Sequence, residues 1–154
     1  MKYVLDNFQD WGQVLDGLKK IEKKGDLHRH QPDLIRMLKY KGNWRLREAA
    51  LESIPQIENP VPELVCEVLN VILDDNVYCE ARVMACRTLN QLIENGKNSS
   101  CGCRLFGELS IADNLKTLTV VPQPPMLMSA VSGCLSSLAD SAEKEQVMAA
   151  RTSI

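Results

Sequence analysis

The chain has 154 residues and a mass of 17.2 kDa, which suits one domain whose core needs no disulfide or metal to hold it. Apolar residues make up 45% and charged residues 25% of the chain, a balance that excludes wholesale disorder. The 18 basic and 20 acidic side chains give a net charge of −2, which excludes a protein that coats nucleic acid or an anionic membrane with its whole surface.

The sequence indicates neither a signal peptide nor a membrane span. Asp6 and Asp10 interrupt the N-terminus before an apolar run of signal-peptide length develops. The longest uncharged stretch, residues 117–139, contains three prolines, which disfavour a transmembrane helix. We therefore expect a cytoplasmic protein with no membrane partner, whose six cysteines are reduced thiols.

Helical periodicity begins near residue 8 and predicts a first helix that ends at Gly25. Apolar residues recur at spacings of three and four, and a lysine-rich turn precedes the glycine, as at many helix C-termini. A second helix is expected to begin near Pro32, because proline fits the first helical turn, and to end at Gly42. The first apolar stripe is Phe8, Trp11, Leu15, Leu18 and Ile21, and the second is Leu34, Ile35 and Leu38.

The next pair of helices repeats this design. One helix is expected over residues 44–57 and another over residues 62–72, separated by a proline-rich turn. A third opening helix is expected over residues 77–95, after the acidic turn at Asp74 and Asp75. The positions expected to point inward are Leu46, Ala50, Ile54 and Ile57, then Leu64, Val65, Val68, Leu69 and Ile72, then Ala81, Ala85, Leu89 and Leu92.

An internal repeat relates the successive helix pairs. A shift of 35 residues lays the segment 47–57 on the segment 82–92, with arginine, alanine and two large aliphatic residues at matching positions. A shift of 30 residues lays Pro32 on Pro62 and so aligns the two second helices. Small alanines where helices cross, flanked by large aliphatic residues, let neighbouring helices pack closely. The repeat therefore predicts an all-α protein built from stacked helix pairs.

The segments 44–54 and 80–89 resemble the first-helix pattern of the HEAT-repeat family. Each contains an aliphatic residue, an arginine, paired small residues and a later large aliphatic residue, and the resemblance covers roughly residues 7–96. It implies a short α–α superhelix, a HEAT-like solenoid, in which the second helices form a curved surface.

The same resemblance implies a structural role for two arginines. Arg47 and Arg82 would each contact an acidic residue between neighbouring units. Asp74 and Asp75 are the candidate partners for one of them.

The C-terminal third departs from the repeat. Two glycines weaken the apolar stripe near residues 98–107, and Ser110 is expected to cap a short helix over residues 111–118. A proline-rich connector and one further helix follow, which we interpret as an atypical cap of the stack. We therefore expect one domain over residues 1–154, with repeats at about 7–42, 43–75 and 76–118 and a capping helix at about 124–150.

The start of that last helix is also a candidate contact surface. If Met126, Leu127 or Met128 is exposed, it offers an adaptable apolar contact. Closure of the core is the simpler interpretation of these side chains.

No constellation of side chains indicates catalysis. His28 and His30 flank Arg29, whose positive charge disfavours a cation, so we interpret them as loop residues and not as metal ligands. Cys101 and Cys103 lie two positions apart without a second cysteine pair at zinc-site spacing. We therefore expect a protein that is not an enzyme, with no catalytic residue, no metal and no cofactor.

Charge is unevenly distributed along the chain. Residues 1–47 contain eleven basic and six acidic side chains, a net +5, whereas residues 48–154 contain seven and fourteen, a net −7. The basic segment is a candidate surface for anions such as phosphate backbones, and the polarity makes self-association a hypothesis. The side chains assigned to the anion surface are Lys19, Lys20, Lys23, Lys24, Arg29, Lys41 and Arg45.

The pattern favours a non-catalytic protein–protein interaction or scaffold module. Such stacks present extended surfaces to an extended or helical protein or peptide partner. One alternative is nucleic-acid binding through the basic N-terminal repeat, and another is an accessory role in an enzyme system. The outward positions expected to contact a protein partner are Asp33, Arg36, Lys39, Glu63, Glu67 and Asn70.

Overall fold

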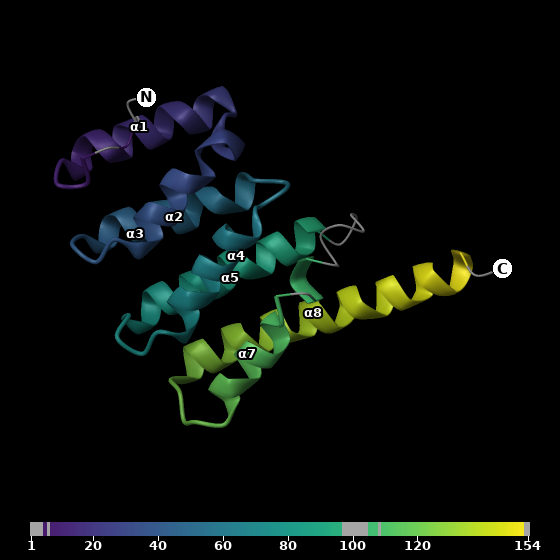
Figure 1. Cartoon of the computed structure of the whole chain (residues 1–154). Helices are drawn as coiled ribbons and strands as arrows, with labels where there is room; N and C mark the ends of the chain where they lie inside the picture. Colours follow the sequence, from purple (N-terminus) through teal and green to yellow (C-terminus); the bar gives the residue numbers. More distant parts are fainter. Residues whose placement is uncertain (1–4, 6, 97–104, 108, 153–154) are drawn as a thin grey trace.

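The computed structural model describes residues 5, 7–96, 105–107 and 109–152, and the regular structure within these residues is entirely helical. Figure 1 shows the helices following one another across the molecule in chain order, from α1 at one end to α8, whose last turns extend beyond the rest. The elements are α1 (Trp11–Lys24), the 3-10 turn η1 (Leu27–His30), α2 (Gln31–Lys39), α3 (Trp44–Ser53), the 3-10 turn η2 (Ile54–Gln56), α4 (Pro62–Leu73), α5 (Cys79–Gly96), α7 (Ile111–Thr119) and α8 (Pro125–Thr152).

The helices pack in a continuous series. α1 lies against α3, α2 lies against both α3 and α4, α4 lies against α5, and α5 lies against α8. The buried side chains form one cluster that extends from Leu5 to Cys134. The inward positions predicted within residues 44–57, 62–72 and 77–95 are all buried, which confirms the helical periodicity of these segments.

Local sequence accounts for several helix ends. α1 ends at Gly25, whose φ of 71° is a left-handed conformation that glycine adopts without a side-chain clash. α3 begins after Asn43, whose side chain accepts a hydrogen bond of 2.9 Å from the backbone N–H of Arg45. α2 and α4 each have a proline in the first turn, as predicted from Pro32 and Pro62.

Two helices end earlier than the sequence predicts. α2 ends at Lys39 and not at Gly42, because the residue after Lys39 adopts an extended backbone. α3 ends at Ser53, and the chain continues as the 3-10 turn Ile54–Gln56. Pro55 lies in this turn and has no N–H with which to continue α-helical hydrogen bonding.

Ser110 is the residue before α7, as predicted, but its side chain makes no capping hydrogen bond. Ser110 precedes the helix, but its φ of 51° differs from the extended backbone that directs a capping hydroxyl at the first turn. Its backbone carbonyl instead accepts a hydrogen bond of 3.2 Å from the N–H of Asn114.

The same arginine contact joins consecutive helix pairs at two places. Arg47 of α3 donates from Nε to the carbonyl oxygen of Leu38 at 3.0 Å, and Arg82 of α5 donates from Nε to that of Ile72 at 2.8 Å. Each acceptor is the penultimate residue of the preceding helix, α2 or α4. The last carbonyls of a helix have no intrahelical partner, so a cationic donor there satisfies one of them and interacts favourably with the helix dipole.

Arg82 also makes an acidic contact of the kind that the family resemblance implied. Its Nη2 lies 3.3 Å from Oδ1 of Asp75, with the guanidinium buried and the carboxylate exposed. Asp74 instead accepts a hydrogen bond of 2.9 Å from the backbone N–H of Asn76. This bond is the main cause that lowers the pKa of the Asp74 carboxyl, and the positive charge of Lys41 adds to it.

We predict that Arg82→Met lowers the free energy of unfolding by about 2 kcal/mol, because it leaves the Ile72 carbonyl without its charged donor. Arg47→Met should cost less, since Arg47 is only half-buried. Urea denaturation followed by circular dichroism measures both changes. Arg87→Met, at an exposed position of the same helix, is the control, and a loss no larger for Arg82→Met than for this control would contradict the role of the contact.

Candidate functional site

The residues predicted to contact a partner lie on α2 and α4, which pack against each other. Lys39 Nζ of α2 lies 3.6 Å from Glu67 Oε1 of α4, and the same oxygen accepts a hydrogen bond of 3.3 Å from Asn70 Nδ2. Glu63 is exposed one turn earlier on α4, and Arg36 is half-buried on α2. Five of the six residues therefore reach solvent on this pair of helices, which we call the α2–α4 surface.

Asp33 does not belong to the α2–α4 surface, and the prediction that it points away from the core is wrong. The residue is only 4% exposed. Its carboxylate accepts a hydrogen bond of 3.4 Å from Arg36 Nη1 and lies 3.1 Å from Nδ1 of His30. The cause is η1, which runs directly into α2 and so places His30 over the first turn of that helix. Asp33 holds this junction together.

Asp33→Asn should therefore destabilise the fold by about 1–2 kcal/mol, because a buried carboxylate that bonds a charged donor is lost while the side-chain volume is kept. Thermal unfolding measured by calorimetry provides the comparison. Glu63→Gln, an exposed isosteric change in the first turn of α4, is expected to leave the unfolding temperature nearly unchanged. Equal shifts for both variants would show that Asp33 has no structural role.

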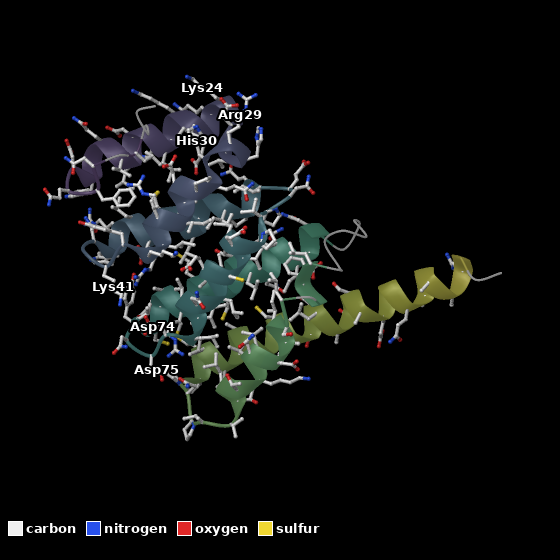
Figure 2. The ribbon with its side chains drawn as sticks, in the orientation of Figure 1. Lys24, Arg29, His30, Lys41, Asp74 and Asp75 are labelled. Atoms are coloured by element: carbon white, nitrogen blue, oxygen red, sulfur yellow. The ribbon has the colours of Figure 1, made fainter. Side chains whose placement is uncertain are left out.

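The residues assigned to the anion surface do not form one patch. Lys23 and Lys24 end α1, whereas Arg45 lies over the ring of Trp11, which begins α1, at 5.4 Å from its centroid. At 1.5 Å per residue the two ends of this helix are about 20 Å apart. Figure 2 shows Lys24 and Arg29 together and Lys41 well separated from them, beside the turn of Asp74 and Asp75. The basic side chains therefore divide into two groups, and the second adjoins carboxylates.

The two histidines singled out in the sequence are not placed as a pair of metal ligands. His28 is exposed, and His30 contacts Asp33. Cys101 and Cys103 lie outside the residues that the structure describes. Among the described residues, no group of three or more His, Cys, Asp or Glu side chains is placed to hold a metal ion.

The sequence reasoning missed an exposed row of aromatic side chains. Trp11 and Trp44 are the first residues of α1 and α3, and Tyr78 directly precedes α5. They are 41%, 53% and 39% exposed, although Trp11 was predicted to belong to the buried stripe of its helix. We call Trp11, Trp44 and Tyr78 together with Arg45 the aromatic row.

The aromatic row is continuous. Arg45 lies over the rings of both tryptophans, 5.4 Å from the centroid of Trp11 and 5.5 Å from that of Trp44. The rings of Trp44 and Tyr78 meet edge to face with centroids 6.2 Å apart. The spacings of 33 and 34 residues differ from the 35-residue shift of the internal repeat, which lays Trp44 on Cys79, so the alignment did not reveal the row. Tryptophan, tyrosine and arginine are the residues that most often dominate binding energy at protein interfaces.

Tyr78 is held in its protonated form. Its hydroxyl donates a hydrogen bond to Oε1 of Glu48 on α3. Partial burial, followed by this bond to a carboxylate, raises the pKa of Tyr78 well above its ordinary value of 10.0. The bond ties the start of α5 to α3.

The raised pKa of Tyr78 predicts a loss of stability in alkali. A phenol whose pKa is higher in the folded than in the unfolded chain contributes stability below pH 10.0, and that contribution disappears as the pH rises toward the folded pKa. Tyr78→Phe should therefore make the free energy of unfolding depend less on pH above about 10. Urea denaturation at a series of alkaline pH values tests this, with Tyr40→Phe as the control, and an unchanged slope for Tyr78→Phe would disprove it.

A groove lies between α5 and the first turns of α8, with a volume of about 560 Å³. Three residues at the start of α8 were candidates for an apolar contact: Met126 is exposed, Met128 is half-buried and Leu127 is buried. This helix therefore closes the core and also leaves Met126 at the surface. Beneath the groove the thiol of Cys134 donates to the carbonyl of Cys86 at 3.1 Å. The groove is lined by Val83, Cys86, Arg87, Asn90, Pro125, Met126, Ser129, Ala130 and Gly133.

Comparison with protein-family models, with curated proteins and with solved structures finds no match to this chain. None of the helices in the described part of the chain combines the length and the apolar character needed to cross a membrane.

Proposed function

We propose that the protein is a non-catalytic interaction module with a HEAT-like arrangement of helix pairs. Two observations support this arrangement. The Arg47 and Arg82 contacts to the preceding helix recur at equivalent positions of successive pairs, and an aromatic residue lies at or directly before the start of each opening helix. Stacks of this kind present a surface that grows with each pair and that suits an elongated partner.

The α2–α4 surface is the proposed binding site. The observation that carries this proposal is the contact of Lys39 with Glu67, which joins the exposed polar side chains of two consecutive pairs into one face. The Lys39 side chain remains 61% exposed in this pair, so its charge stays accessible. An exposed ion pair contributes little to stability, which leaves recognition as a use for its charges.

The charges of this surface define the class of partner. Arg36 and Lys39 are on α2, whereas Glu63 and Glu67 are on α4. Arg36 is also held over the ring of Phe8, 4.9 Å from its centroid, which restricts its side chain. A protein segment with acidic residues facing α2 and basic residues facing α4 would complement this pattern.

Exchanging the two charges tests the proposal. The double variant Lys39→Glu with Glu67→Lys keeps an ion pair between α2 and α4 but reverses the charge that each helix presents. We expect the double variant to unfold at the wild-type temperature. The amount of protein that it retains should be lower by about tenfold or more than the amount that the immobilised wild-type chain retains, because like charges would then face each other. Quantitative mass spectrometry of nuclease-treated eluates measures the retention.

A second double variant is the matched control. The double variant Glu143→Lys with Arg151→Glu also leaves the net charge unchanged. Both positions are exposed and lie in the C-terminal part of α8, which is not part of the α2–α4 surface. It should retain the wild-type set of proteins. If the exchange at positions 39 and 67 retains the same set as this control, the α2–α4 surface is not the binding site. If nuclease abolishes retention by the wild type, the partner is a nucleic acid.

A further inference from the structure

Two exposed apolar features include none of the residues of the α2–α4 surface. One is the aromatic row. The other is the connector between α7 and α8, residues 120–126, in which Val120 is 81% and Val121 57% exposed and the prolines and Met126 are also exposed. Adjacent exposed valines and exposed tryptophans in one small protein indicate surfaces that are covered by a partner.

The aromatic row and the connector lie along one edge of the molecule. The row marks the starting ends of α1, α3 and α5, and Figure 1 shows these ends on the same side as the connection from α7 to α8. Val83, in the second turn of α5, and Pro125, which begins α8, line the same groove, which places the connector next to the start of α5. Along the edge the order is therefore Trp11, Trp44, Tyr78 and then the connector.

The two features are chemically complementary. Proline rings and valine side chains pack on aromatic faces, and a proline-rich segment has backbone carbonyls without internal hydrogen bonds. The two tryptophans can supply the matching donors, because each has an indole N–H and a side chain that is about half exposed. The two ring centroids lie at most about 11 Å apart, since Arg45 is within 5.5 Å of each. One turn of a polyproline II helix is about 9 Å long, so a segment of a few residues is long enough to contact both rings.

Charge favours a second copy of the chain as the partner. The N-terminal residues 1–47, which include Trp11, Trp44 and Arg45, have a net charge of +5, and the remaining residues have a net charge of −7, although the connector itself is uncharged. Two copies placed edge to edge in opposite directions bring the basic part of each against the acidic part of the other. A two-fold axis between α3 and α5 achieves this, and it gives a closed pair in which every contact occurs twice.

We propose that two copies of this chain form a two-fold symmetric dimer in which the connector of each, residues 120–126, docks against the Trp11 end of the aromatic row of the other. Trp44 of one copy then faces Tyr78 of its partner across the axis. The proposal does not rest on the proposed function, because it uses none of the residues of the α2–α4 surface.

Sedimentation velocity of the full chain tests the proposal, with Trp11→Ala and Val121→Asp as the variants. The wild type should form a species of twice 17.2 kDa that does not grow further with concentration. Damage to one contact is expected to raise the dissociation constant of the dimer by about 30-fold. Each variant alone damages both copies of the contact, so its dissociation constant should rise by about 900-fold. An equimolar mixture of the two variants retains one intact contact in each mixed dimer, so the rise should be only about 30-fold.

Tryptophan fluorescence gives a second readout. Trp11 and Trp44 are the only tryptophans in the sequence, so the emission reports on the aromatic row alone and should shift to shorter wavelength as the wild type dimerises. The control is Val147→Asp, because Val147 of α8 is 53% exposed, much like Val121, yet lies far from the connector. It should dimerise as the wild type does, and circular dichroism should show the same fold for all variants.

Four outcomes would overturn the dimer. A wild type that stays monomeric up to about 1 mM has no specific contact of useful strength. If the mixture of the two variants associates no better than either variant alone, the connector does not dock against the aromatic row. Species that grow beyond the dimer indicate an open head-to-tail chain. A monomer whose emission shifts with an added proline-rich peptide assigns the row to a foreign segment.

Discussion

The packing of consecutive helices in this chain depends on hydrogen bonds to the backbone carbonyls at the end of each helix, which the next pair covers. The last carbonyls of α2 and α4 would be left without donors at a packed interface, at a cost of about 1–3 kcal/mol for each one that is buried. Arg47 and Arg82 supply those donors, from positions nine and ten residues after their acceptors. Because an arginine side chain has a limited reach, the contact also limits the length of the turn between the helices.

Hydrophobic periodicity was sufficient to predict the helices and their buried positions, because burial on one face of a helix follows directly from 3.6 residues per turn. It failed where a neighbouring element decides exposure. Asp33 has the spacing of an outward residue, but η1 covers the first turn of α2 and buries it. Trp11 has the spacing of an inward residue, but it is the first residue of α1 and remains exposed. The contact of Arg82 with Asp75 was expected from the family resemblance, and the structure contains it.

The candidate surfaces were harder to predict than the helices, because each depends on two elements at once. The outward positions of α2 and α4 were identifiable separately, whereas the contact of Lys39 with Glu67 depends on how the two helices are placed. The basic residues are close in the sequence, yet the length of α1 separates them into two groups. The aromatic row was not aligned by the 35-residue repeat, and its exposure depends on the tertiary arrangement.

The last helix differs in character along its length. α8 has 28 residues, which corresponds to about 42 Å, and the last buried side chain described on it is that of Ser141. The turns beyond Ser141 contribute no other buried side chain among those described, and an isolated helical segment of that length is only marginally stable in water. Local unfolding should therefore spread inward from this end without cost to the core. The order of the distal part of α8 thus depends on helix propensity and on what the helix contacts, and little on the stability of the core.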